Sequence, residues 1–206
     1  MPLTVEDLHV AYGATNILNG VMFEVGAGQS VAVMGPSGSG KSTLMAAIAG
    51  ELEPNSGRIS RSGIGSIEWI FQSAPILARR SALDNVALGP LARGSSRSRS
   101  IALATRAMKS LGIFNLARSP AFRLSGGERQ RVAVARALAS GSELILADEP
   151  TAALDSQSKG LVIAALLAAT SYGASLIVAT HDDEVALACD RTYQLHAGQL
   201  KIRVSG

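Results

Sequence analysis

The sequence of 206 residues has little cysteine, few aromatic residues and no long apolar run. Its one cysteine, Cys189, excludes a disulfide within the chain, and the residues around it lack the spacing of a metal site. The longest apolar run, residues 161–169, is about half as long as a helix that spans a bilayer, so we expect no membrane span. The first residues lack the charged start and apolar core of a secretory signal, and we therefore expect a cytoplasmic protein.

The scarcity of aromatic residues, 4% of the chain, bears on its basic segments. The formal net charge is +3, and much of the positive charge lies at Arg79 and Arg80 and in residues 93–109. Such a segment either binds nucleic acid or forms the solvated face of a helix. Bases are commonly held by stacking on aromatic side chains, and none is interleaved with these cations. We favour the solvated helix face and expect no nucleic-acid partner.

The segment Gly35-Pro36-Ser37-Gly38-Ser39-Gly40-Lys41-Ser42 has the spacing of a P-loop. It lies between residues 30–34, expected to form a strand, and residues 43–49, expected to form a helix. The glycines let backbone N–H groups surround a phosphate, and the positive end of the helix points to the same place. Lys41 is expected to reach the outer phosphates, and the Ser42 hydroxyl to hold Mg2+. The alternative is a flexible linker, but linkers do not lie between a buried strand and a helix.

The chain before and after the P-loop predicts a mixed α/β fold. Residues 3–33 show the pattern of short strands and turns. Tyr12 stands alone in a polar turn there, where it either packs in the ordinary way or stacks on a nucleotide base. The pattern turns helical over residues 73–140, which we interpret as an inserted subdomain. With 47% hydrophobic residues, a chain of this length can bury the core of one such domain.

A second anion-binding motif lies within the helical insertion. The segment Leu124-Ser125-Gly126-Gly127-Glu128-Arg129-Gln130 precedes an amphipathic helix expected over residues 131–139. Glycines at a helix start form a nest of N–H groups, and the helix dipole favours negative charge there. Because one P-loop already surrounds its own nucleotide, the second nest most simply serves the nucleotide of another subunit.

Carboxylates follow a strand that we expect to be buried on both faces. The strand covers residues 143–147 and ends in Asp148 and Glu149. Ligands in open α/β sheets gather at the carboxyl ends of strands, so Asp148 is placed to order Mg2+ through water and Glu149 to polarise an attacking water. Residues 175–180 predict another buried strand, which ends at His181. A histidine in that position could reach a γ-phosphate.

In this order, the motifs resemble the nucleotide-binding subunit of an ABC transporter, and the resemblance covers essentially the whole chain. Gln72, at the end of the strand expected over residues 67–71, matches the Q-loop of that family, and Ala153-Leu154-Asp155 matches the D-loop. Residues 124–130 match the signature, residues 144–149 the Walker B motif, and His181 the switch histidine. The resemblance implies three sets of site residues: for catalysis Glu149, His181 and Gln72; for the nucleotide Tyr12, Gly35, Pro36, Ser37, Gly38, Ser39, Gly40, Lys41, Ser42, Thr43, Ser125, Gly126, Gly127 and Asp155; for the metal Ser42, Gln72 and Asp148.

The resemblance also implies an architecture and an activity. The fold is a RecA-like P-loop NTPase core, residues 1–72 and 141–206, with an N-terminal antiparallel β subdomain and a helical subdomain over residues 73–140. The activity is hydrolysis of ATP with Mg2+. It is carried out by a head-to-tail dimer that sandwiches two ATP molecules and drives transport through integral membrane permease subunits at the inner face of the membrane.

Within the family, the residues around Gln72 and His181 look most similar to the ATPases for lipoprotein release, macrolide export and cell division. Two alternatives stay open. One is an ATPase that signals through a membrane partner without transport, as the cell-division member does. The other is a soluble nucleic-acid ATPase, although such proteins carry long coiled coils or tandem heads, and this sequence has neither heptads nor a repeat.

Overall fold

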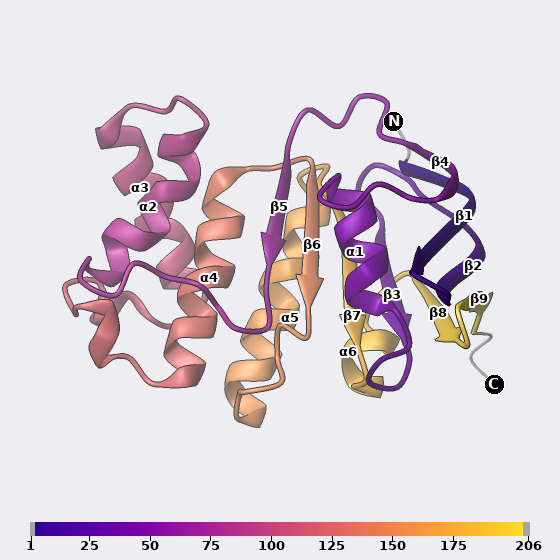
Figure 1. The fold of residues 1–206 in the computed structure, drawn as a ribbon. Coiled ribbons are helices and arrows are strands. Elements are labelled where there is room, and N and C mark those ends of the chain that lie inside the picture. The colour runs from indigo at the N-terminus through magenta and orange to yellow at the C-terminus, as the bar shows by residue number, and fades with distance from the viewer. Residues whose placement is uncertain (1–2, 204–206) are drawn as a thin grey trace. The chain divides into compact units, whose positions relative to one another are not determined.

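The alternating and continuous apolar patterns become two β-sheets in the computed structural model, which describes residues 3–203 (Figure 1). The chain divides into two compact units. The first, called here the sheet unit, holds the chain up to Trp69, Glu143–Glu149 and the chain from Thr170. The second, called here the helical unit, holds Ile70–Ser142 and Pro150–Ala169. The sequence assigned residues 150–169 to the ATPase core, whereas here they group with the helical unit.

The first sheet is antiparallel and three-stranded, with β1 (Leu3–Tyr12) between β2 (Thr15–Val25) and β4 (Ser56–Ser60). Val5 of β1 pairs with residues of both neighbours, and the regular register is interrupted just after it. Asp7 lies at that interruption with a φ of 45°, a left-handed conformation that a bulge can impose. This sheet corresponds to the N-terminal antiparallel β subdomain that the resemblance implies.

The second sheet has six strands in the order β5-β6-β7-β3-β8-β9. Strands β6, β7, β3 and β8 run parallel, and β9 pairs antiparallel with β8 (Figure 1). Every residue of β3 and β7 is buried, as their continuous apolar sequences predicted. The bounds are β3 Ser30–Met34, β5 Ile67–Ile70, β6 Leu144–Asp148, β7 Ser175–Thr180, β8 Arg191–His196 and β9 Gln199–Ile202.

The parallel register brings the candidate polar residues to one edge of the second sheet. Met34, the last residue of β3, pairs with Thr180, the last residue of β7. Asp148, the last residue of β6, pairs with Ala179. The P-loop, the Asp148 carboxylate and the segment after β7 therefore leave the sheet side by side, at the carboxyl ends where ligands bind in such sheets.

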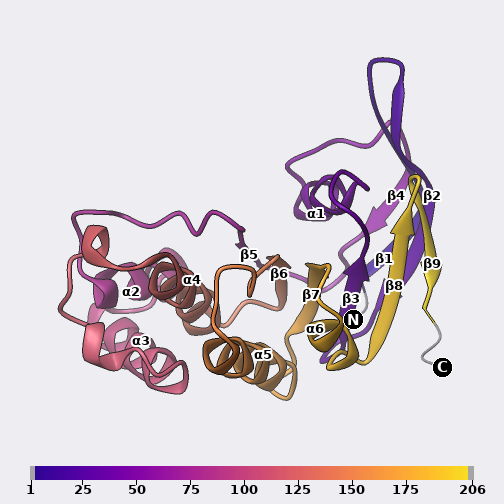
Figure 2. The same cartoon turned by 90° about the horizontal axis from the view of Figure 1, so that it is seen from below.

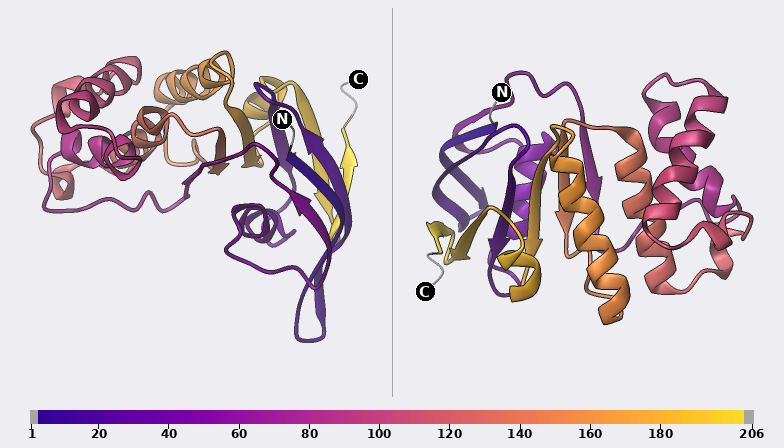
Figure 3. Two further views of the ribbon diagram at one scale, coloured as in Figure 1. Left: turned by 90° about the horizontal axis from the view of Figure 1, so that it is seen from above. Right: turned by 180° about the vertical axis from the view of Figure 1, so that it is seen from behind.

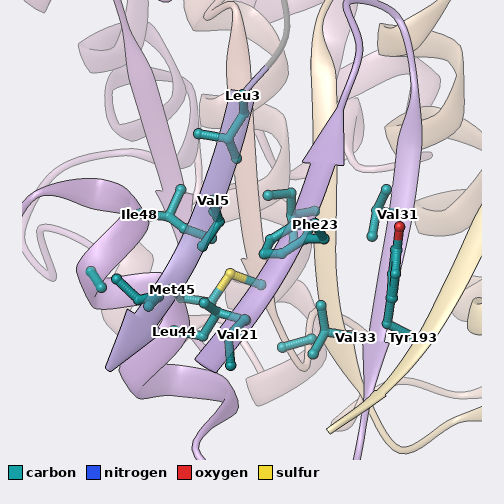
Figure 4. Close-up of a cluster of buried hydrophobic side chains, with 14 of the residues drawn as sticks. Leu3, Val5, Val21, Phe23, Val31, Val33, Leu44, Met45, Ile48 and Tyr193 are labelled. Carbon is teal, nitrogen blue, oxygen red and sulfur yellow. The ribbon is translucent and has the colours of Figure 1, made fainter. Parts of the chain in front are cut away.

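Two helices cover opposite faces of the second sheet: α1 (Lys41–Ala49) and α6 (Asp183–Leu187) (Figure 2). Val31 and Val33 of β3 join a large apolar core with α1, while Met34 packs with Ala186 of α6. Figure 4 shows the large core, in which side chains of both sheets and of α1 meet, including a tilted contact between the Phe23 and Tyr193 rings. This core fixes the strand ends and the start of α1.

The helical unit is built mainly from four α-helices, with α2 and α3 packed on each other and on α4 (Figure 3). The buried residues of α3, among them Ala104 and Met108, recur at helical spacing, and Ser96 caps the start of the helix by accepting the Arg99 N–H. The bounds are α2 Ala82–Ala92, α3 Arg97–Ser110, α4 Gly126–Ser140 and α5 Ser156–Thr170, with short 3-10 turns at Phe114–Leu116 and Ala121–Arg123.

Among residues 3–203, no helix has both the length and the apolar character needed to cross a bilayer.

Candidate nucleotide-binding site

The P-loop is a tight backbone cradle between β3 and α1. A side chain at Gly35 would come within 2.4 Å of the Leu195 carbonyl oxygen and 2.6 Å of Ser39 Oγ. Gly40 caps α1 in a left-handed conformation with a φ of 104°, and a Cβ there would come within 3.0 Å of Leu18. Gly35 is therefore required because a side chain has no space there, and Gly40 because glycine adopts the left-handed conformation without strain. The helix begins at Lys41, two residues before the expected start.

Lys41 is held on the inside of this cradle by the loop itself. Its ammonium group donates hydrogen bonds to the carbonyl oxygens of Gly35 at 2.8 Å and Pro36 at 3.2 Å. The residue is 9% exposed. Both acceptors are neutral carbonyl oxygens, so the positive charge of Lys41 is available to an anion at the loop.

A hydroxyl and a carboxylate meet beside the loop. Ser42 Oγ, on the first turn of α1, donates a hydrogen bond of 2.6 Å to Asp148 Oδ2 at the end of β6. These oxygens are the kind of ligand that Mg2+ prefers, and Mg2+ is usually held by one or two protein oxygens together with phosphate oxygens and water. The donor set therefore fits Mg2+ with Ser42 and Asp148 as its contacts in the sheet unit.

Glu149 and His181 form a second polar pair at the same edge of the sheet. Glu149 Oε1 lies 2.8 Å from Nδ1 of His181, and the Glu149 side chain is 10% exposed against 71% for His181. A carboxylate partner at Nδ1 favours the proton on that nitrogen, which leaves Nε2 facing away from Glu149. The pair thus offers a shielded carboxylate and an exposed imidazole at one place.

The backbone around Glu149 is unusual. Its φ is 47°, a left-handed conformation that costs a residue with a side chain on the order of 1–2 kcal/mol. The Glu149 N–H donates to the Ala179 carbonyl oxygen at 2.9 Å, which ties this turn to β7. Thr180 Oγ1, fully buried, lies 3.4 Å from Glu149 Oε2 and accepts the Asp182 N–H at 3.1 Å. The sequence reasoning missed Thr180; its signal was a polar residue at the end of a buried apolar strand.

Tyr12 and Thr43 are the other candidates in the sheet unit. Tyr12 ends β1 with 56% of its surface exposed, so its ring is not part of the core. Of its two expected roles, this exposure fits base stacking better than ordinary packing. Thr43 is half-buried in the first turn of α1, next to Ser42.

The remaining candidates belong to the helical unit, where Ser125 caps α4. Ser125 Oγ accepts the Glu128 N–H at 3.2 Å, and a Glu128 carboxylate oxygen accepts the Ser125 N–H at 2.7 Å, which completes a capping box. A Cβ on Gly127 would lie 3.2 Å from the Ala153 carbonyl oxygen, whereas a Cβ on Gly126 would meet nothing within 4 Å. The helix start expected here is therefore present, and the space beside Gly126 is open within this chain.

Asp155 and Gln72 occupy surface turns of the helical unit. Asp155 accepts the Ser158 N–H at 2.9 Å and the Ser158 hydroxyl at 2.8 Å. These bonds hold the pKa of Asp155 below its ordinary value, and they make this residue a cap for α5. Gln72 is exposed in a turn just after Phe71, whose carbonyl oxygen accepts a bond from Gln130 at 3.4 Å.

The order of these motifs has a counterpart in known proteins. The family model described as ABC transporter matches residues 18–152. The chain belongs to the ABC transporter family. It is 37% identical over 203 residues to the lipoprotein-releasing system ATP-binding protein LolD of Novosphingobium aromaticivorans, with 90% of each chain covered. It is 36% identical over 200 residues to the macrolide export ATP-binding/permease protein MacB of Mannheimia succiniciproducens, covering 90% of this chain and 31% of MacB.

A solved structure supports the same fold. A dimeric ATP-binding cassette in a post-hydrolysis state, bound to ADP and Pi, matches with a TM-score of 0.88 and 29% identity over 99% of this chain and 100% of the cassette. The P-loop NTPase fold expected from the sequence is thus confirmed, and the protein is an ABC-type ATPase that powers a transporter.

Proposed function

We propose that the site at the carboxyl ends of β3, β6 and β7 hydrolyses ATP with Glu149 as the general base. One observation carries the proposal: the shielded Glu149 carboxylate directly follows Asp148 at the end of β6, and Asp148 contacts Ser42 at that same edge of the sheet. A general base must lie within hydrogen-bond reach of the water that it activates. A buried carboxylate next to a metal-ligand pair meets the requirement of in-line attack by water on a γ-phosphate.

Each residue of the site has a place in this reaction. The P-loop N–H groups and Lys41 hold the phosphates of ATP. Ser42, Asp148 and, by the resemblance, Gln72 hold Mg2+, which neutralises phosphate charge when bound. Glu149 takes a proton from a water molecule while the oxygen of that water bonds to the γ-phosphorus. The bond between the γ-phosphorus and the oxygen that bridges it to the β-phosphate breaks, and ADP leaves with that oxygen. His181 keeps the Glu149 carboxylate oriented through Nδ1 and presents its other nitrogen toward the γ-phosphate.

We further propose that two copies of the chain share each nucleotide. The cradle at Gly35–Ser42 and the nest at Ser125–Gly127 are two anion sites in one chain, and the open side of Gly126 leaves room for a ligand from outside. Asp155, in the D-loop segment that contacts Gly127 through Ala153, would lie at the same interface. The dimeric state of the cassette bound to ADP and Pi supports this arrangement.

The partner that converts hydrolysis into transport is proposed to be an integral membrane permease on separate subunits. LolD, which this chain matches over 90% of both lengths, is named as an ATP-binding protein alone, whereas the chain spans about a third of the ATP-binding/permease protein MacB. Both names describe release or export, and we place this chain with that group, at the inner face of the membrane. The names favour transport over the two alternatives left open by the sequence.

The docking site for the permease is proposed at the start of α2. Leu77 is 51% exposed and lines a hollow of about 220 Å3 together with Leu88, Leu91 and Ile101. The backbone of Leu77 is fixed, because the buried Asn85 side chain bonds its N–H at 2.7 Å and its carbonyl oxygen at 3.1 Å. An exposed apolar side chain on a fixed backbone suits an apolar segment of a partner.

Glu149→Gln tests the catalytic assignment. The variant should bind ATP normally and lose turnover by about 10²–10⁴-fold, the usual contribution of a positioned base. Glu143→Gln is the matched control, because Glu143 precedes the opposite end of β6, where its carboxylate contacts Ser66. Binding is measured by nucleotide fluorescence and turnover by phosphate release. Near-normal hydrolysis by Glu149→Gln, or an equal loss in the control, would contradict the assignment.

A further inference from the structure

Charge is divided unequally between the two units. The helical unit holds 13 of the 19 lysines and arginines and 3 of the 16 aspartates and glutamates, a formal net charge of +10. The sheet unit holds the other 6 and 13, a formal net charge of −7. The overall charge of +3 hides this separation. Charge gathered on one part of a surface determines which partners approach it.

The three acidic residues of the helical unit are engaged at helix starts. Asp84 accepts the Ser81 hydroxyl at 2.7 Å at the start of α2. Glu128 accepts the Ser125 N–H at the start of α4, and Asp155 accepts both Ser158 groups at the start of α5. These carboxylates serve helix caps, so the surplus of cations within the unit is its main electrostatic feature.

The most regular group of cations lies on α3. Arg99, Arg106 and Lys109 are exposed and follow one another at spacings of seven and three, which places them on one side of the helix. They extend along about 15 Å of α3. The buried residues of α3 face the opposite side, toward the rest of the unit. We call this surface, Arg99, Arg106 and Lys109, the α3 basic face.

The α3 basic face is unfavourable for the isolated helix. Arg106 and Lys109 are like charges three residues apart, and Arg99 lies in the first turn, where the helix dipole is already positive. The sequence of α3 offers no acidic residue to offset them. Anionic groups brought against this surface would reduce the repulsion between its cations.

We propose that the α3 basic face binds the anionic headgroups of membrane phospholipids. The proposal rests on the proposed function in one respect, that the protein works beside a membrane. The other exposed side chains on this side of α3 are small, Ser98, Ala102 and Ser110, so the three cations can approach a flat layer of phosphate groups without a matching cleft. Cytoplasmic leaflets carry anionic lipids that attract clusters of Lys and Arg. The Phe114 ring at one end of the face lies 5.2 Å from Lys109 Nζ and is thus covered by that cation, so the proposed location beside a membrane is what favours lipid over nucleic acid.

The test is flotation of the purified full chain with phosphatidylcholine vesicles, with and without phosphatidylglycerol, in the absence of ATP. The protein should bind the anionic vesicles, and added salt should release it. Each cation near an anionic surface strengthens binding about fivefold, so the triple variant R99Q/R106Q/K109Q should bind roughly 100-fold more weakly. None of these residues belongs to the proposed ATPase site, so basal hydrolysis should stay normal and serves as the folding control.

Two matched variants sharpen the result. R58Q/R191Q/K201Q removes the same charge from the sheet unit and should bind like the wild type, and R99K/R106K/K109R keeps the charge and should also bind. Should the glutamine triple fail to fold, Arg106→Gln alone should weaken binding about fivefold. Equal binding to neutral vesicles, an equal loss in the sheet-unit control, or RNA that displaces the anionic vesicles at equimolar phosphate would overturn the proposal. Because no nucleotide is present, failure here is distinguishable from failure of the ATPase assignment.

Discussion

Gly126→Ala separates the folding of the signature segment from its proposed role between two copies of the chain. Gly126 is the first residue of α4, and a methyl group there would meet nothing within 4 Å in its own chain. Its φ is not in the left-handed region, so alanine can adopt the same conformation. The substitution should therefore leave the monomer intact.

The magnitude for the monomer follows from helix propensity. Glycine to alanine at a compatible position stabilises a protein by about 0.4–1 kcal/mol, mainly by restricting the unfolded chain. For a chain of this size, 1 kcal/mol raises the melting temperature by roughly 2–4 °C. We expect a Tm equal to or slightly above that of the wild type, and unchanged binding of ATP to the P-loop of the same chain.

Dimerisation should respond in the opposite direction. If a phosphate of the second copy's nucleotide approaches the Gly126 N–H, an added methyl group occupies part of its space. Overpacking of a filled site typically costs 1–3 kcal/mol, and the proposed dimer contains two such sites, so the dimer should be weaker by at least about 5–150-fold. The assay is light scattering after size exclusion with ATP, in the Glu149→Gln background so that the nucleotide persists.

Gly160→Ala is the matched control. Gly160 lies within α5, also with nothing within 4 Å of an added Cβ, and alanine should stabilise it by a similar amount. ATP-driven dimerisation of this variant should be unchanged. If Gly126→Ala dimerises as well as Gly160→Ala, the open side of the nest does not face a second nucleotide, and the reasoning from the two anion sites is refuted.

Two further predictions concern the partner and acid stability. Leu77→Glu should leave basal ATP hydrolysis within a few-fold of normal, because Asn85 holds the backbone of residue 77. The variant should neither co-purify with the permease nor be stimulated by it, since burying an unpaired carboxylate in the interface is costly. If the permease still stimulates the variant, the docking site lies elsewhere. The Ser30 N–H and hydroxyl, each 2.7 Å from Asp190 Oδ2, hold the pKa of Asp190 below its ordinary 3.8, so this stabilisation is present above about pH 3.8 and is lost as the pH falls through the lowered value. Ser30→Ala should lower the free energy of unfolding at pH 7 by less than about 1 kcal/mol, and the difference from the wild type should shrink in more acidic buffer. Urea unfolding at several pH values measures this difference, and a difference that does not change with pH would contradict the prediction.

Much of the sheet unit could be predicted because its patterns are local. The continuous apolar runs before the P-loop and before Asp148 are typical of strands buried on both faces, and parallel strands put their carboxyl ends at one edge. Placing Ser42 and Asp148 together needed no more than that. The pairing of Glu149 with His181 needed the turn at Glu149, whose left-handed backbone no local pattern indicates.

The C-terminal hairpin shows why other parts could not be predicted. Strands β8 and β9 are joined by Ala197 and Gly198, with φ values of 47° and 75°, and tight hairpin turns of this kind require a positive φ at both central residues. Asn-Gly is the usual signal, and alanine rarely adopts that conformation. A contact from another part of the chain also stabilises the turn, because the Asn19 N–H of β2 donates to the Gly198 carbonyl oxygen at 2.8 Å. A turn stabilised from outside its own sequence leaves little trace in that sequence.

Gly126 and Gly127 show where the structure adds something that the sequence cannot supply. Side by side in the signature, they have the same apparent role, that of freeing N–H groups at a helix start. In the structure, packing within the chain explains the glycine at position 127, because a Cβ there would lie only 3.2 Å from the Ala153 carbonyl oxygen. Packing does not explain Gly126, since the space beside it is open within its own chain. Gly160 is equally open but lies within α5, whereas Gly126 begins α4, where the N–H groups of a helix start favour negative charge, so the ligand that we propose beside Gly126 is an anion.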